Sequence, residues 1–259
     1  MKKISFRISS ATLVAVLSVA WLVSANPLSP SSLLQVTPQD ALETHGLSAF
    51  LFHNSYDGVF GDEKMSGLEI IFHEQPIATN GDVRLSPTPA QWDPIPRFKN
   101  RKRGASPNEL VASLAYPDKD LSYRIAVQPE DGGIRVAVLL DRALPNQFAG
   151  KAGFNLEFLP NAYFGKSYLV DDSSGMFPRL STGPMEKDSG GAIEPVALAS
   201  GHKIVLSPEN PLTRVSITSD GAPLQLFDGR NQAQKRLVCA AHEITGDHHQ
   251  HWLGPIHRF

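Results

Sequence analysis

The residues that could carry chemistry in this chain begin with its acidic clusters. Asp171 and Asp172 are adjacent, and Asp57, Asp62 and Glu63 form a second group. Cleavage of a sugar–sugar bond needs two carboxylates held about 5–10 Å apart. Neighbouring residues of a strand point to opposite faces, so adjacency alone does not make such a pair. The second group also lacks the spacing of a calcium-binding loop. We therefore interpret both clusters as solvated loops and predict no catalytic residue.

Three aromatic residues are candidates for contact with a sugar. Trp92 lies among the prolines of residues 87–96, which stiffen the loop and keep it at a surface or sheet edge. Tyr163 and Tyr168 bound a short aromatic segment that also carries a lysine. The face of an aromatic ring favours the polarised C–H groups of a sugar. The alternative is that Trp92 caps the core and that the tyrosines alternate between core and solvent, because aromatic rings bury large area.

The other residues of possible chemical interest do not form a recognisable site. The last part of the chain carries the histidines His242, His248, His249, His251 and His257. Histidines bind zinc or nickel, but this stretch has no strand or helix period and no clear carboxylate ligand. Cys239, the only cysteine, lies in an apolar run typical of a buried position. No Gly-x-Ser-x-Gly segment or phosphate-binding glycine loop occurs. We predict no metal and no other cofactor.

A basic run occupies residues 99–103, with the sequence Lys-Asn-Arg-Lys-Arg. It could bind an anionic surface or polymer, or it could be a solvated hairpin loop, and we favour the loop. The formal net charge of the chain is −2, so no wider basic character supports it. A nucleic-acid partner would usually need a strongly basic chain, and we therefore predict none.

Residues with the period of a strand must position all these groups. Residues 121–128 and 134–140 each alternate apolar and polar side chains, and residues 129–133 between them contain Asp-Gly-Gly. This pattern predicts a β-hairpin, because such turns tolerate positive φ. Further strands are predicted in the following segments: 68–73, 109–116, 154–158, 202–206, 213–218 and from 224 onward. With 20 glycines and 20 prolines, the chain fits many short strands. We predict an all-β, Greek-key-like antiparallel β-sandwich with little helix.

The first 25 residues have the order of a secretory signal peptide. Lys2, Lys3 and Arg7 precede an apolar run over residues 11–23 and a small-residue triplet. The run is short for a bilayer span, which needs about 20 residues, although an uncleaved anchor is the alternative. We predict a secreted or periplasmic protein that has no membrane segment after cleavage. Residues 26–43 then read as a linker or arm, because they are rich in proline and serine.

Several longer segments occur in the order of a known module. They are residues 77–85, 87–96, 150–157, 164–168, 175–179 and 224–230. This series resembles the β-rich N-terminal module of secreted bacterial proteins of glycoside hydrolase family 9, the endoglucanase or cellulase family. The resemblance covers residues 44–236, which we expect to form the β-sandwich module. It implies a non-catalytic accessory module that braces the enzyme or contacts β-glucan, with the catalytic domain normally in the same chain.

The chain also departs from that family. The Asp-Ala-Gly-Asp motif of the catalytic domain does not occur in the sequence, so no catalytic residue is carried over. Residues 237–259 form a His-rich tail that we expect to fit no strand, which suggests truncation or a reading-frame change. Two alternatives stay open: a glycosidase that acts through its own carboxylate pair, and a structural or docking protein of the cell envelope.

Overall fold

The computed structural model describes residues 34–44, 46–53, 67–86, 93–130, 133–187, 190–191, 193–231, 237–243 and 250–257. The side chains of residue 160 and of residues from 231 onward are outside this description. All described residues belong to one unit, residues 32–259. The predicted signal peptide, residues 26–33 of the predicted linker and the carboxylates Asp57, Asp62 and Glu63 lie outside the described residues.

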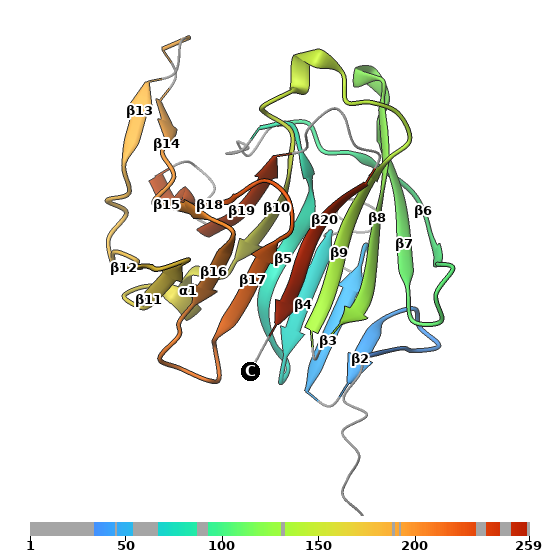
Figure 1. The fold of residues 1–259 in the computed structure, drawn as a ribbon, viewed down its shortest axis with the longest axis horizontal. Helices are drawn as coiled ribbons and strands as arrows, with labels where there is room; N and C mark the ends of the chain where they lie inside the picture. Colours follow the sequence, from blue (N-terminus) through green and yellow to red (C-terminus); the bar gives the residue numbers. More distant parts are fainter. Residues whose placement is uncertain are drawn as a thin grey trace, which may run out of the picture. The chain divides into compact units, whose positions relative to one another are not determined.

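Two antiparallel sheets make up most of the described part of the chain (Figure 1). In these residues, sheet A has nine strands in the order β1 (Gln35–Val36), β2 (Leu42–Thr44), β3 (Leu47–Leu51), β4 (Leu68–Phe72), β5 (Gln75–Arg84), β10 (Gly153–Phe158), β19 (Leu237–Glu243), β18 (Leu224–Asp228) and β15 (Ala199–Gly201). Sheet B, counted over the same residues, has nine in the order β12 (Ser173–Met176), β11 (Ser167–Val170), β16 (Lys203–Leu206), β17 (Val215–Ser219), β20 (Gln250–His257), β9 (Gly133–Leu140), β8 (Leu121–Glu130), β7 (Leu110–Tyr116) and β6 (Arg97–Arg103).

The remaining elements are short. Strands β13 (Met185–Lys187) and β14 (Ile193–Pro195) pair only with each other, as a separate hairpin. The helical turns of the described residues are η1 (Pro117–Lys119), η2 (Asn146–Phe148), α1 (Pro160–Tyr163) and η3 (Gly229–Asn231). No helix in the described ranges has the length and apolar character needed to cross a bilayer.

The core lies between the two sheets. One cluster of buried apolar side chains takes members from sheet A, such as Leu68 and Phe154, and from sheet B, such as Leu114, Ile125 and Val136. Successive side chains of a strand face opposite sides, so each sheet contributes one face to this cluster. The predicted antiparallel β-sandwich is confirmed.

The predicted hairpin is confirmed as β8 and β9, which pair from Tyr123 opposite Leu140 to Glu130 opposite Gly133. The apolar positions predicted to share one face of β8, including Tyr123 and Ile125, are buried. The other predicted strands correspond to β4, β7, β10, β16, β17 and β18. Alternation identifies these strands because each has one face in the core.

Two segments differ from the expectation at the start of the sandwich and along one edge. Part of the predicted linker is structured: β1 pairs with β2, β2 pairs with β3, and Leu42 is buried. The basic run of residues 99–103 is not a loop, because it belongs to β6, which pairs with β7. The composition of both segments is polar enough to resemble a loop, but neighbouring strands supply their hydrogen bonds.

The prediction that residues 237–259 fit no strand is wrong. β19 lies inside sheet A and pairs with both β10 and β18. β20 lies inside sheet B and pairs with both β17 and β9. Figure 1 shows β19 and β20 as dark red arrows beside strands from earlier parts of the chain. The sandwich therefore extends beyond residues 44–236 at both ends.

Candidate functional site

Adjacent strands β5 and β10 carry a set of polar residues that we call the β5–β10 polar cluster: Asn80, Asp82, Arg84, Asn155 and Glu157. Asn155 stands opposite Asp82 in the pairing of the two strands. Between that pair and the next, two residues of β5 oppose one residue of β10, which defines a β-bulge. Asn80 has a φ of 53° at this bulge. Asparagine tolerates this left-handed conformation better than most residues, so the sequence Asn80-Gly81 suits the bulge.

Asp82 is one of two buried acids in the cluster, with Glu157, and it connects the two sheets. Its Oδ1 accepts a hydrogen bond of 2.8 Å from the hydroxyl of Tyr123 on β8 and one of 2.7 Å from the backbone N–H of Val83. Burial raises the pKa of Asp82 to about 7, because desolvation penalises the carboxylate more than these two hydrogen bonds and the charge of Arg84 favour it. The carboxyl therefore changes its protonation near neutral pH.

Two tyrosines of sheet B reach the same part of β5. The rings of Tyr116 and Tyr123 stack with centroids 6.3 Å apart. The hydroxyl of Tyr116 donates to the backbone carbonyl of Val83 over 2.8 Å. Burial, together with the nearby charge of Asp82, raises the pKa of both tyrosines above the ordinary value. Both hydroxyls therefore remain protonated donors, and they fix the separation of the sheets here.

The side-chain amide of Asn155 is buried and has no hydrogen-bond partner among the described residues. The residue is 2% exposed, and within the described part of the chain neither Oδ1 nor Nδ2 has a hydrogen bond. The Nε of Arg84 is in the same situation among those residues. Glu157, by contrast, accepts a 2.8 Å hydrogen bond from the amide of Asn80. A buried amide without partners costs about 1–3 kcal/mol, so this position suits a water or a ligand hydroxyl.

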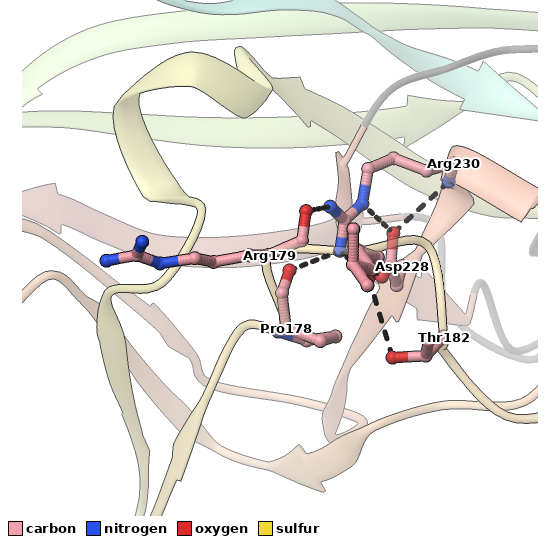
Figure 2. A network of polar contacts seen from close by, with 6 residues as sticks. Pro178, Arg179, Thr182, Asp228 and Arg230 are labelled. Carbon is pink, nitrogen blue, oxygen red and sulfur yellow. Dashed lines mark hydrogen bonds and ion pairs between the residues drawn. The ribbon is translucent and has the colours of Figure 1, made fainter.

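A second polar cluster surrounds Arg230 (Figure 2). Its Nε and Nη2 donate to the two carboxylate oxygens of Asp228 over 2.7 and 2.6 Å. Nη1 donates to the carbonyl of Arg179 over 2.9 Å, and Nη2 also donates to the carbonyls of Pro178 and Leu180 over 2.6 and 3.0 Å. We call this set the Arg230 network.

The Arg230 network is a structural connection rather than a binding site. The side chains of Arg230 and Asp228 are only 7% and 1% exposed. The guanidinium also lies 4.0 Å above the ring of Phe164, a cation–π distance. The planar fork of an arginine matches several acceptors at once, which a lysine cannot do. With its donors engaged, Arg230 holds together the end of β18, the segment after β12 and the turn before β11.

The predicted sugar-contacting residues have separate environments. Trp92 lies outside the described residues. Tyr163 is fully buried, packs edge-on against Phe158 at 5.6 Å and donates from its hydroxyl to the carbonyl of Thr213 over 3.2 Å. Tyr163 has no ring face left for a sugar in this structure, because core residues surround it.

Tyr168 is also buried, at 9% exposure, and burial raises the pKa of its hydroxyl. It stands opposite Gly175 in the β11–β12 pairing, and its ring packs 4.9 Å from the ring of Phe177. A Cβ atom at Gly175 would lie 2.3 Å from the Tyr168 ring, so the ring covers the glycine. The strand-residue alternative, with the ring on the core side, describes Tyr168 better than a sugar contact.

The other residues of possible chemical interest, Asp171 and Cys239, lie within the β-sandwich. The carboxylate of Asp171 accepts backbone hydrogen bonds from His202 and Lys203, at 3.0 and 2.8 Å to its Oδ1. Cys239 stands in β19 between Leu156 and Leu226 of the flanking strands. No group of three or more potential metal ligands gathers among the residues that the structure describes.

Sequence reasoning missed the β5–β10 polar cluster. Its members are polar residues on strands that also carry buried apolar residues, such as Asn155 and Glu157 between Phe154 and Phe158. That alternation suggests a solvated face, yet both residues are buried, at 2% and 6% exposure.

A scan of protein-family models found no match to this chain, and searches of curated proteins and of solved structures found none either.

Proposed function

We propose that this chain is a non-catalytic β-sandwich module of an exported, polysaccharide-degrading glycoside hydrolase similar to family 9. In this role it contacts glucan or braces the catalytic part of the enzyme. The observation that carries the proposal is where the segments of the resemblance lie. Residues 77–85 and 150–157 contribute the β5–β10 polar cluster. Residues 164–168, 175–179 and 224–230 contribute the Arg230 network.

The β5–β10 polar cluster offers groups that a glucan hydroxyl would bind on entering the space beside Asn155, which is 2% exposed. A neutral sugar offers hydroxyl groups, which both donate and accept hydrogen bonds. The Asn155 amide matches this, because it has one acceptor and one donor group, both unpartnered among the described residues. Arg84 adds a donor nitrogen that is likewise unpartnered within that part of the chain. The Arg230 network supports the bracing half, because it fixes three segments into one rigid unit.

The test is retention on insoluble cellulose and related β-glucans with the Asn155→Leu variant. Replacing a buried, unpartnered amide by an apolar side chain of similar size is expected to leave stability unchanged or higher. We expect wild-type protein to be retained and Asn155→Leu to lose at least about tenfold in affinity. The matched control is Asn161→Leu, an exposed position in α1, which is expected to bind like wild type.

Other outcomes separate the alternatives. Absence of wild-type retention on every glucan removes the contact half of the proposal and leaves bracing. The rival hypothesis is a glycosidase that acts through its own carboxylate pair. The raised pKa of Asp82 favours this rival, since a carboxyl that is partly protonated at neutral pH is a candidate general acid. Hydrolysis of soluble β-glucan by wild type that disappears in Asp82→Asn would establish that rival and reject a non-catalytic module.

A further inference from the structure

β6 is an edge strand of sheet B with an unusual number of cations. Its seven residues read Arg-Phe-Lys-Asn-Arg-Lys-Arg, and it pairs only with β7 on one side. The pairing with β7 sorts its side chains into two groups. Arg101 and Arg103 stand opposite Ala112 and Leu110, whose side chains belong to the core. These two arginines are therefore on the inner side of the sandwich.

The two inner arginines donate hydrogen bonds to residues in and beside the first strands of sheet A. Arg101 donates from Nη1 to the backbone carbonyls of Leu51 and Phe52 over 3.1 and 2.9 Å. Arg103 donates from Nη2 to the carbonyl of Thr37 over 2.9 Å and from Nε to Asp40 over 3.1 Å. They close this edge of the sandwich. An inward-pointing charge on an edge strand also blocks pairing with another sheet, so edge protection is already provided.

The other three cations form what we call the β6 cation row: Arg97, Lys99 and Lys102. Arg97 and Lys102 stand opposite Ala115 and Val111 of β7, whose side chains lie on the outer side of sheet B, and Lys99 occupies the irregularity between Phe98 and Asn100. All three are exposed. None of them forms an ion pair or hydrogen bond with the part of the chain that the structure describes. β7 itself carries no charged residue that could neutralise them.

The length and charge of this row define a ligand. Arg97 and Lys102 are five residues apart on a strand that rises about 3.3 Å per residue, so the row is roughly 16 Å long. It borders the uncharged outer side of β7. A single phosphate would fill only one position, whereas a linear polymer with repeated anionic groups fits all three. Lys and Arg bind carboxylates and sulfates through charge-assisted hydrogen bonds.

We propose that the β6 cation row binds a linear acidic polysaccharide, with carboxylate or sulfate groups of successive sugars on Arg97, Lys99 and Lys102. The polymer lies along β6 on the outer side of sheet B. The formal net charge of the chain is −2, so this attraction is local to the row and not a general property of the protein. The inference goes beyond the proposed function, and it holds whether or not a neutral glucan binds at the β5–β10 polar cluster.

The experiment measures binding of the full chain to polygalacturonate and to heparin by isothermal titration calorimetry. The variant Arg97→Gln/Lys99→Gln/Lys102→Gln is compared with the control Lys151→Gln/Lys187→Gln/Lys203→Gln. Both remove three positive charges at exposed positions, but the control residues lie outside β6. We expect wild type and control to bind alike and the β6 variant to weaken by at least about tenfold.

Salt and lipid measurements complete the test without any variant. Raising NaCl from about 0.1 M to about 1 M shortens the Debye length from about 10 Å to about 3 Å and should abolish wild-type binding. Equal loss in both triple variants, salt-insensitive binding or absence of wild-type binding each overturns the proposal. So does binding to vesicles with anionic lipids but not to either polymer. An Arg101→Gln variant should lower the melting temperature but keep polymer binding, because Arg101 contacts sheet A.

Discussion

At the scale of single residues, position in the fold changes the chemistry of common side chains. Asp82 is a carboxylic acid whose partner Tyr123 lies 41 residues away and in the other sheet. No local pattern contains that pair, so sequence reasoning could not find it. Burial of the tyrosines was easier to anticipate, because large aromatic rings are usually buried. Tyr163 and Tyr168 follow that tendency.

The raised pKa of Asp82 predicts a pH dependence of stability. The folded protein holds the Asp82 proton up to about pH 7, whereas the unfolded chain releases it near the ordinary value of 3.8. In that window the folded state binds more protons, so the free energy of unfolding falls as pH rises and levels off above about pH 7. The difference between these two pKa values sets an upper limit of about 4 kcal/mol on the stability lost across this pH range.

Asp82→Asn should flatten this part of the pH profile, because the amide keeps an acceptor oxygen for Tyr123 but does not ionise. The measurement is urea unfolding of wild type and variant at several pH values from about 4 to about 8. Asp118→Asn, at an exposed position, is the control and should retain the wild-type profile. A variant profile as steep as that of wild type would contradict the assignment of the slope to Asp82.

At the scale of elements, sequence patterns identified the strands that have one apolar face. They did not identify a strand with charged residues on both faces, or a network formed by residues distant in sequence. β7, β8 and β9 alternate clearly, and they were predicted. β6 was not, because basic residues on both of its faces hide the period of two. The Arg230 network is equally invisible locally, since Arg230 contacts carbonyls about 50 residues earlier in the chain.

Loss of Arg230 should loosen the segments that it connects. Arg230→Ala leaves the buried carboxylate of Asp228 uncompensated, which typically costs about 3–5 kcal/mol of stability. The double variant Asp228→Asn/Arg230→Met removes both charges and should recover part of that loss. Arg124→Ala is the control, because Arg124 pairs with Asp141 at exposed positions, where a pair contributes at most about 1 kcal/mol. Chemical denaturation measures all three, and equal costs for Arg230→Ala and Arg124→Ala would refute the structural role.

At the scale of the whole molecule, the order of strands in each sheet is the part that sequence patterns cannot supply. The neighbours of a strand in a sheet depend on which other strands the fold brings beside it. β19 and β20 each pair with strands from distant parts of the chain. Their histidines obscured the strand period. The fold class follows from the strands that alternate clearly, whereas the central place of the last segments follows only from the assembled sheets.

The central position of β19 and β20 predicts a severe effect of shortening the chain after Arg236. Both strands would be removed, so β10, β18, β17 and β9 would each lose one of their two neighbouring strands. Unpaired backbone N–H and C=O groups are costly when buried and pair with other chains when exposed. We expect the shortened chain to aggregate and to lose cooperative unfolding, as measured by size-exclusion chromatography and by circular dichroism in increasing urea.

The matched control replaces the β13–β14 hairpin, residues 185–195, with a short glycine–serine link. These strands pair only with each other, so their removal leaves the backbone pairing of sheets A and B intact. A two-stranded hairpin alone contributes little independent stability. The control should therefore elute like the wild type and unfold near the wild-type midpoint. A chain shortened after Arg236 that behaves like this control would show that β19 and β20 do not hold the two sheets together.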